Sequence, residues 1–437
     1  MSKKLRSIVY ALSILFSTSC LLGQAWSEPF DQVDRHLIFL GDSLSDTGNY
    51  PEPANVSHPV LKNFNLYVPV SNPVSAQNSG ISQTFLKNSL GDLVQQGKIN
   101  SEEKTLYSVN WPLYLTYRSS VYPLITWFHM QTQHLSADNI NYAWASAQTG
   151  DPSGKTEANG ACYHDDGSIF PGECDEISVL KNRNIYVKHT ANNPNFDQNT
   201  KYLYDDLQIP DLGKQISFYL DDTSEPLQDN TVFFIYIGNN DIGHFLKKNI
   251  IKIVVYPVAL FQNIIDSHVS LFARNVKVAV HRIESAYQKA PNKHYKVKVL
   301  TLMHLSNLAE GYSYTHPSIF GKPVWIPLIS YRIQAAINNS VDSYNQDLKN
   351  NFADDSHVQV IDSGAFLNQL ASSSKFKDAV DKGKACVNDS AYVQPNTEGT
   401  NNCHYTHDGQ SAVYFSWNNA HLTSPVNLDL AKEVAKS

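Results

Sequence analysis

The segment His36-Leu37-Ile38-Phe39-Leu40 runs directly into Gly41-Asp42-Ser43-Leu44-Ser45-Asp46-Thr47-Gly48-Asn49. Its apolar residues are continuous rather than alternating, which is typical of a strand buried on both faces of a parallel sheet. Ser43 stands on the turn that leaves this strand, between Gly41 and Gly48. A serine so placed is exposed at the carboxyl edge of a sheet and can act as a nucleophile, whereas a helix-capping serine is the ordinary alternative.

Four more short runs, rich in apolar and β-branched residues, predict further buried strands and so a parallel sheet of five. Helical patterns alternate with these runs, because one apolar face extends through residues 266–288 and another through residues 330–352. Strands that alternate with helices predict an α/β fold with right-handed crossovers. The four runs lie around residues 140–143 and at residues 231–237, 295–302 and 357–361.

Two long segments do not fit a minimal sheet. Residues 51–138 and 150–210 are rich in Asn, Pro, Gly and Tyr and weakly periodic. We expect them to be insertions at one end of the sheet, where α/β proteins place substrate selectivity. Aromatic residues in the first segment are a candidate acyl-chain or membrane-facing surface, with a plain hydrophobic core as the alternative. They are Trp111, Tyr114, Tyr117, Tyr122, Trp127 and Phe128.

The charge balance of the chain disfavours one class of partner. The 437 residues include 34 Lys and Arg against 41 Asp and Glu, a formal net charge of −7. Such a chain has no basic field to hold a phosphate backbone, so nucleic-acid binding is not expected.

Residues 1–25 have the pattern of a secretory signal peptide. Basic residues at positions 3, 4 and 6 precede an apolar run over residues 8–22, and Gly23-Gln24-Ala25 offers a cleavage site. A membrane anchor needs roughly 20 apolar residues, more than this run supplies. Lipid attachment at Cys20 would need an aliphatic residue at the position of Ser17. We predict a secreted protein, extracellular or periplasmic, whose mature part, residues 26–437, is one domain.

Four cysteines remain after such cleavage. They form two sequence-local pairs, Cys162 with Cys174 and Cys386 with Cys403. An even number in an exported chain predicts disulfides, of which the local pairing is the simplest of three connectivities. A metal site made of Cys386, Cys403 and nearby histidines is the alternative, but the short Cys-x-x-Cys spacing of a zinc knuckle is absent from the sequence. No metal ligand set is predicted.

The nine-residue string at 41–49 resembles the first block of the GDSL (SGNH) esterases and lipases, Gly-Asp-Ser-Leu/Ile-Ser-Asp-Thr-Gly-Asn. The resemblance implies that Ser43 is the nucleophile. The second block, Asn-Tyr-Ala-x-Gly-Gly-Ala, is similar to residues 141–147, where Ser146 supplies the backbone N–H of the second glycine as an oxyanion donor. The third block, Gly-x-Asn-Asp, is met by residues 238–241 and implies a side-chain oxyanion donor at Asn240. The N–H of Ser43 completes this oxyanion hole.

The last block is where the chain departs from the family. The pattern Trp-Asp-x-x-His-Pro-Thr is similar to residues 417–423, which implies that His421 is the general base. Asn418 stands where the orienting carboxylate belongs. An amide carbonyl can still accept the imidazole N–H, as in Cys-His-Asn proteases, although loss of the acid costs about 10⁴ in kcat in serine proteases. Either Asn418 orients His421, or another carboxylate such as Asp408 does, or the enzyme is slow.

The resemblance spans the mature chain and implies a three-layer α/β sandwich around a central parallel sheet, with long loop insertions. The signal peptide, the insertions and the cysteine-bounded segment are most like secreted bacterial phospholipases A and glycerophospholipid:cholesterol acyltransferases. The expected activity is release of fatty acids from phospholipids and lysophospholipids through a Ser43 acyl-enzyme, at a membrane surface, with acyl transfer to a sterol as a second outcome. The resemblance also implies that cleavage of the 386–403 loop by a protease raises activity, and that no cofactor is needed.

Two other functions stay open at this point. A carbohydrate or short-chain aryl esterase would use the same fold and triad, because these do not fix the acyl donor. A lipid-binding module with a degenerate triad is the non-enzymatic alternative, and Asn418 is the reason to consider it.

Overall fold

The computed structural model describes the central part of the fold and several short segments around it. The described residues are 36–47, 64–65, 70–71, 110–118, 124–127, 139–144, 147–150, 162–163, 169–170, 186–187, 202–203, 210–222, 227–316, 318–319, 322–385, 414–416 and 420–437.

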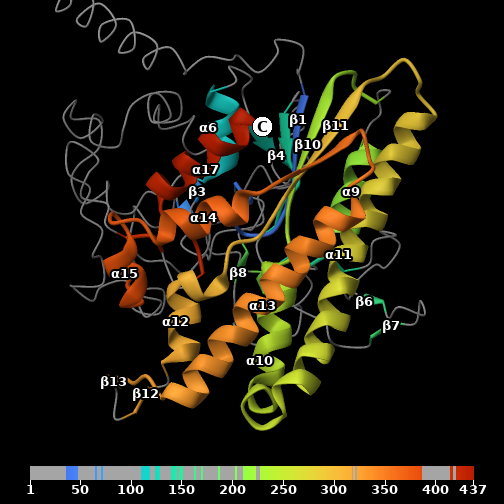
Figure 1. The fold of residues 1–437 in the computed structure, drawn as a ribbon. Helices are drawn as coiled ribbons and strands as arrows, with labels where there is room; N and C mark the ends of the chain where they lie inside the picture. The colour runs from blue at the N-terminus through green and yellow to red at the C-terminus, as the bar shows by residue number, and fades with distance from the viewer. Residues whose placement is uncertain are drawn as a thin grey trace, which may run out of the picture.

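A parallel sheet forms the centre of the protein (Figure 1). Its strands lie in the order β14-β11-β10-β1-β5-β4, and every neighbouring pair is parallel. The five predicted strands are all present, which confirms the predicted α/β class. They are β1 (His36–Gly41), β5 (Asn139–Asn141), β10 (Thr231–Tyr236), β11 (Tyr295–Leu300) and β14 (Val358–Ile361).

A sixth strand, β4 (Leu124–Thr126), extends the sheet beyond β5. It falls inside residues 51–138, which we expected to be an insertion. The helix α6 (Trp111–Arg118) lies in the same segment and packs against the last helix of the chain. Part of that segment therefore belongs to the central fold, and the insertion is narrower than the sequence suggested.

Helices cover both faces of the sheet and give the three layers (Figure 1). One layer contains α9 (Leu212–Asp222), α11 (Val258–Gln288) and α13 (Pro327–Asn351). The last two correspond to the two predicted helices and begin earlier than predicted, and α13 ends one residue before residue 352. The other contains α6, α14 (Ser363–Ala371) and α17 (Ser424–Lys436). A further long helix, α10 (Asn239–Val255), packs against α11 and α13.

The remaining elements are short. They are the helices α12 (Ala309–Thr315) and α15 (Lys377–Asp381), the 3-10 turn Leu305–Asn307, and four antiparallel strand pairs. These pairs are β2 (Phe64–Asn65) with β3 (Val70–Ser71), β6 (Cys162–Tyr163) with β7 (Ile169–Phe170), β8 (Tyr186–Val187) with β9 (Tyr202–Leu203), and β12 (Ser318–Ile319) with β13 (Lys322–Pro323). Within the described part of the chain, no helix is both long and apolar enough to cross a bilayer.

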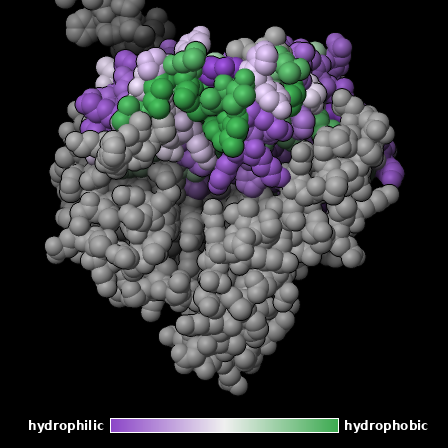
Figure 2. All heavy atoms as spheres, turned by 90° about the horizontal axis from the view of Figure 1, so that it is seen from below, coloured by the Kyte–Doolittle hydropathy of each residue, from purple (hydrophilic) through white to green (hydrophobic). Residues whose placement is uncertain are grey.

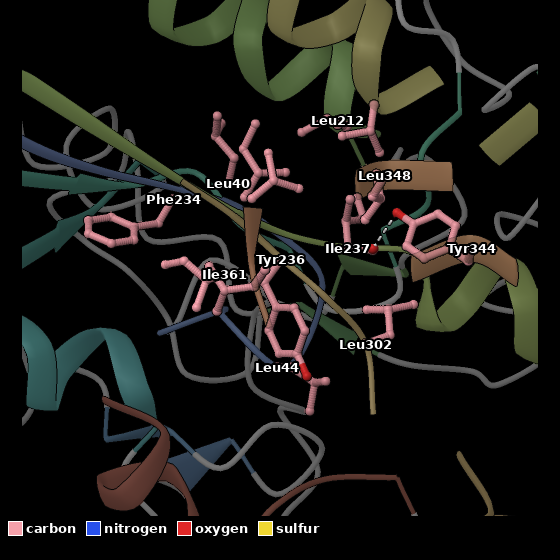
Figure 3. Packing of buried hydrophobic residues seen from close by; sticks show 14 of the residues in the cluster. Leu40, Leu44, Leu212, Phe234, Tyr236, Ile237, Leu302, Tyr344, Leu348 and Ile361 are labelled. Carbon is pink, nitrogen blue, oxygen red and sulfur yellow. Dashed lines mark hydrogen bonds between the residues drawn. The ribbon is translucent and has the colours of Figure 1, made fainter. Parts of the chain in front are cut away.

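The side chains of β10 pack against aromatic residues on both faces of the sheet, which explains why the sequence of this strand is almost continuously apolar. Phe233 packs edge-to-face against Tyr219 of α9 and Tyr287 of α11. Phe234 points to the other face, where its ring lies edge-on to Trp111 of α6 and stacks on Phe39 of β1 at a centroid distance of 5.1 Å. Because each face of the strand meets a helix layer, every position must be apolar. Figure 3 shows Leu40 of β1 and Phe234 and Tyr236 of β10 among the buried residues of the core.

At Trp111 the structure distinguishes the two interpretations of the aromatic segment, an acyl-chain or membrane-facing surface and a hydrophobic core. Its side chain is fully buried and contacts Phe39, Phe234 and Tyr236. Trp111 therefore belongs to the hydrophobic core rather than to an acyl-chain surface.

Candidate active site

The turn after β1, residues 42–47, is named the Ser43 loop. Its backbone closes on itself, because the Asp42 carbonyl accepts the N–H groups of Ser45 and Asp46, each at 3.0 Å. Ser43 is partly exposed, whereas the other five residues of the loop are buried. The loop thus presents one side chain outward, and that side chain is the predicted nucleophile.

Two asparagines from distant parts of the sequence hold the Ser43 loop. Asn110, just before α6, donates from Nδ2 to the carbonyl of Asp46 at 2.8 Å. Asn141, at the end of β5, donates from Nδ2 to the carbonyl of Ser45 at 2.7 Å and to the Thr47 hydroxyl at 2.8 Å. All five residues are buried, so these bonds satisfy backbone groups that water does not reach.

Gly41, where β1 ends, is fixed just as closely. Gln215 of α9 accepts the Gly41 N–H at 2.8 Å and donates to its carbonyl at 2.9 Å. The Trp144 N–H donates to the same carbonyl at 3.1 Å. Gly41 has φ +152°, and a Cβ there would lie 2.2 Å from the Tyr236 carbonyl oxygen. Only glycine fits this approach of β1 to β10.

Asn240 reaches the same edge of the sheet from the neighbouring strand. Gly41 and Tyr236 are register partners at the ends of β1 and β10, so the residues that follow both strands leave the sheet side by side. Gly238 makes the turn into α10 with φ +119°, and the Tyr344 ring occupies the space of a Cβ. The Tyr344 hydroxyl donates to the Ile237 carbonyl at 2.8 Å (Figure 3).

The Asn240 amide is oriented by one hydrogen bond. Its Nδ2 donates to the Ala147 carbonyl at 2.9 Å, and the residue is partly exposed. A carboxamide nitrogen carries two hydrogens, so a second N–H can be donated to a substrate oxygen. Ala147 directly follows Ser146, the residue expected to supply a backbone oxyanion donor. Ser146 itself lies outside the described residues.

Asp241 ties the start of α10 to the segment that follows β5. Its buried carboxylate accepts the Thr149 N–H at 3.1 Å and the Thr149 hydroxyl at 2.7 Å. Asn275 of α11 donates to the Gly150 carbonyl at 2.9 Å and so fixes the same segment from the other side. These bonds set the distance between Ala147 and the helix that carries Asn240.

Two buried carboxyl groups dominate the electrostatics of the site. Burial raises the pKa of Asp42, the Leu44 N–H opposes this shift, and the nearby charge of Asp241 adds to it, so that the pKa is about 7. Burial also raises the pKa of Asp241 to about 6, although the bonds from Thr149 oppose the shift. At neutral pH the negative charge beside Ser43 is therefore partly suppressed by protonation.

His421 lies on a short loop that is closed at its base. Ser416 forms an antiparallel bridge with Leu422, and the Thr423 N–H donates to the Phe415 carbonyl at 3.0 Å. The loop leads into α17, which packs against α6, the helix whose preceding residue Asn110 holds the Ser43 loop. The packing of α17 against α6 thus connects the loop that carries His421 to the residue that holds the Ser43 loop.

Burial lowers the pKa of His421 to about 3, because the imidazolium form loses its hydration there. The residue as a whole is 8% exposed. His421 is consequently neutral at physiological pH, and a neutral imidazole is the form that can accept a proton from a serine hydroxyl.

Buried polar atoms that lack a hydrogen-bond partner gather around this edge of the sheet, within the part of the chain that the structure describes. Such atoms are uncommon in folded proteins and often mark functional sites, where substrate or water completes them. The set includes Ser45 Oγ, Asn110 Oδ1, Trp111 Nε1, Gln148 Oε1 and Tyr236 OH.

Several predicted features lie outside the described residues. They include the signal peptide, Ser146, Asn418, Asp408, and the side chains of the four cysteines, of which Cys162 contributes its backbone to β6. The described residues do bring Ser43 and Asn240 to one edge of the sheet and place His421 before α17. Among them, no group of three His, Cys, Asp or Glu could hold a metal ion.

The residues that hold the site in place, Asn110, Gln215 and Thr149, were not predicted from the sequence. Gln215 had a detectable signal, because it lies on the face of α9 that carries Leu212, Ile216 and Tyr219. A polar residue on a buried helix face must find a partner. Asn110 and Thr149 had no comparable signal, since each precedes or follows an element without any repeating pattern.

The fold and this edge together define a class, an α/β protein with a candidate site at the carboxyl ends of its central strands, where open parallel sheets bind ligands. In comparisons with known proteins, no protein-family model matches the chain and no curated protein matches it either.

Proposed function

We propose that this protein is a serine ester hydrolase that releases fatty acids from phospholipids and lysophospholipids. The observation that carries the proposal is the presentation of Ser43: it is the one partly exposed residue of a loop whose other residues are buried, at the carboxyl end of the central strand β1. The loop is bonded from α6 and β5, so the serine is held rigidly. A fixed, exposed hydroxyl is what nucleophilic catalysis requires.

The mechanism is covalent. The Ser43 hydroxyl attacks the ester carbonyl while its proton passes to the neutral imidazole of His421. The N–H groups of Ser43 and Ser146 and the second amide N–H of Asn240 hold the oxyanion. The imidazolium returns the proton to the leaving alcohol, and an acyl-enzyme remains. Water activated by His421 then releases the fatty acid, or a sterol hydroxyl accepts the acyl group instead.

Regulation by the loop 386–403 is supported by its starting point. Ala385, directly before Cys386, forms a parallel bridge with Ser416, which in turn bridges Leu422 beside His421. A loop that leaves the fold at this place is attached two bridges away from the proposed general base. Cleavage inside the loop is therefore expected to change activity, and secretion of the chain is expected to favour its disulfide.

The test is fatty-acid release from phospholipid and lysophospholipid by the mature protein, before and after limited proteolysis. Ser43→Ala should abolish release and labelling by a fluorophosphonate, whereas Ser356→Ala, a change at an exposed serine before β14, should alter neither. Asn240→Ala should lower kcat by about 10²–10³ with little change in KM, as loss of an oxyanion donor does. Turnover that survives Ser43→Ala would refute the proposal, as would an inert chain whose Ser43 resists labelling.

A further inference from the structure

The far end of α10 forms an apolar tip together with the start of α11 and the start of α13. The tip comprises the exposed residues Ile251, Val255, Tyr256, Leu260, Val324, Trp325, Leu328 and Tyr331. Ile251 and Leu328 are 75% and 71% exposed, values usual for charged surface residues rather than aliphatic ones. Figure 2 looks onto this end of the molecule and shows hydrophobic residues gathered there.

The exposed residues of the tip lie on different helix faces from the residues that form the core. In α10 the opposite face, with Ile242, Phe245, Leu246 and Ile253, is buried. On α13, Leu328 and Tyr331 are one turn apart and share the outward face. Monomeric proteins seldom gather so many large apolar side chains on one exposed surface unless it binds something.

The tip is rigidly built. Arg332 of α13 donates to the Val254 carbonyl at 2.8 Å and to the Tyr256 carbonyl, so α13 is fastened to the last turn of α10. His316, after α12, packs against the Trp325 ring at a centroid distance of 5.1 Å. The apolar side chains are therefore presented on a fixed surface rather than on a mobile loop.

The two stretches of sequence that form the tip carry only basic charges, in a chain that is negative as a whole. Residues 242–265 contain Lys247, Lys248 and Lys252, all three exposed, and no Asp or Glu. Residues 317–341 contain Lys322 and Arg332 and likewise no carboxylate. The whole chain carries −7. Apolar and aromatic residues flanked by lysines match a bilayer with anionic headgroups, which attracts each lysine and takes up Trp and Tyr at its interface.

The tip also lies on the same side of the sheet as the candidate site. Helix α10 begins at Asn239, beside Asn240, and runs away from the carboxyl edge of the sheet for 17 residues (Figure 1). At 1.5 Å per residue this places the tip roughly 25 Å beyond that edge. A bilayer that contacts the tip would face the edge from which Ser43 is exposed.

We propose that the apolar tip inserts into the surface of an anionic phospholipid bilayer and so holds the protein at the membrane with the Ser43 edge of the sheet facing the lipid. This inference rests on the proposed function for its purpose, but the binding itself requires no catalysis. A second copy of the chain is the competing occupant, and the test separates the two.

Binding is measured with the full mature chain carrying Ser43→Ala, so that no lipid is consumed. The probes are vesicles of phosphatidylcholine alone and of phosphatidylcholine mixed with phosphatidylglycerol, and the readout is cosedimentation. The double variant Ile251→Asp with Leu328→Asp should bind mixed vesicles about tenfold or more weakly, because two aliphatic anchors are replaced by like charges. Val278→Asp, at an exposed valine of α11 outside the tip, is the matched control and should bind like the parent.

A second pair of variants tests the contribution of the lysines to vesicle binding. Lys247→Gln with Lys248→Gln should weaken binding to mixed vesicles by about fivefold per lysine and leave the weak binding to phosphatidylcholine unchanged. Lys289→Gln with Lys296→Gln removes the same charge from exposed positions far from the tip, just after α11 and in β11, and should have little effect. Circular dichroism checks that each variant is folded, and the tip residues are exposed enough for the changes to be tolerated.

The outcomes are distinguishable. Vesicle binding that persists in the Ile251 and Leu328 variant, or is absent from the parent, overturns the inference even if soluble short-chain esters are hydrolysed. Self-association in sedimentation velocity that the same variant abolishes, without vesicle binding, assigns the tip to a second copy instead. Tip-dependent vesicle binding by a chain that hydrolyses no ester would support the docking surface while refuting the proposed function.

Discussion

Asp42, next to the proposed nucleophile, makes the fold less stable as the pH rises, and Asp42→Asn should remove that effect. Burial raises the pKa of Asp42 to about 7, whereas an unburied aspartate has a value of 3.8. The folded state thus holds its proton more tightly than the unfolded state. The resulting stabilisation is complete below pH 3.8 and is lost as the pH rises through 7.

The shift corresponds to about 4 kcal/mol, of which about 3 kcal/mol develops between about pH 5 and about pH 8. Asparagine has no charge to bury, and its amide oxygen can still accept the Leu44 N–H. The free energy of unfolding of Asp42→Asn should therefore rise by about 3 kcal/mol relative to the parent across this range.

Urea unfolding at several pH values measures this difference, and Asp378→Asn is the control. Asp378 is exposed, and hydrogen bonds from Lys382 and Lys384 lower its pKa, so it is ionised in both states throughout the range. Its difference from the parent should not change between about pH 5 and about pH 8. A difference for Asp42→Asn that is equally flat would mean that the carboxyl is hydrated, and would refute the buried environment described for the Ser43 loop.

Two further changes test the supports of the site. Gly238→Ala should destabilise the fold by about 2–4 kcal/mol, because alanine would need φ +119° and its Cβ would lie 2.7 Å from the Tyr344 ring. Gly243→Ala, where nothing lies within 4 Å of the new Cβ, should instead stabilise it by up to about 1 kcal/mol in the same urea assay. Thr149→Val removes the hydroxyl donor of the buried Asp241 carboxylate and should cost about 1–3 kcal/mol, with a raised KM or lowered kcat if Asn240 moves with it. An unfolding midpoint equal to that of the parent would contradict the role given to Thr149.

The sequence was sufficient to predict the strands whose burial is uniform. β1 and β10 lie inside the sheet with a helix layer on each face, and their apolar runs follow directly from that environment. β4 was missed because it has three residues at the edge of the sheet, and its pairing with β5 rather than its composition makes it a strand. Helix α10 contains the run Ile250-Ile-Lys-Ile-Val-Val255, which favours a strand by propensity. Packing against α13 makes it helical.

In the candidate site, the predicted catalytic residues could be placed from local sequence, whereas the residues that support them could not. Ser43 and Asn240 each follow a buried strand within four residues, and parallel strands bring such positions to one edge. A motif of a few residues therefore contains enough information to place them. No local motif predicts the residues that hold the site by hydrogen bonds. Gln215 is 174 positions from its partner Gly41, and Asn110 is 64 positions from its partner Asp46. Such partners are determined by the folded topology alone.

Helix α10 joins the two proposals physically. Its first turn carries Asn240 and Asp241, which are bonded to the segment after β5, and its last turn carries Ile251 and Val255 of the apolar tip. Between these ends the helix is continuous and buried on one face, so the site and the tip keep a fixed distance and direction from each other. Because the tip lies roughly 25 Å beyond the Ser43 edge, this relation would turn the site toward the bilayer, and a lipid would have to leave the surface to reach Ser43. The rigid connection through α10 would supply that orientation without any change in the Ser43 loop itself.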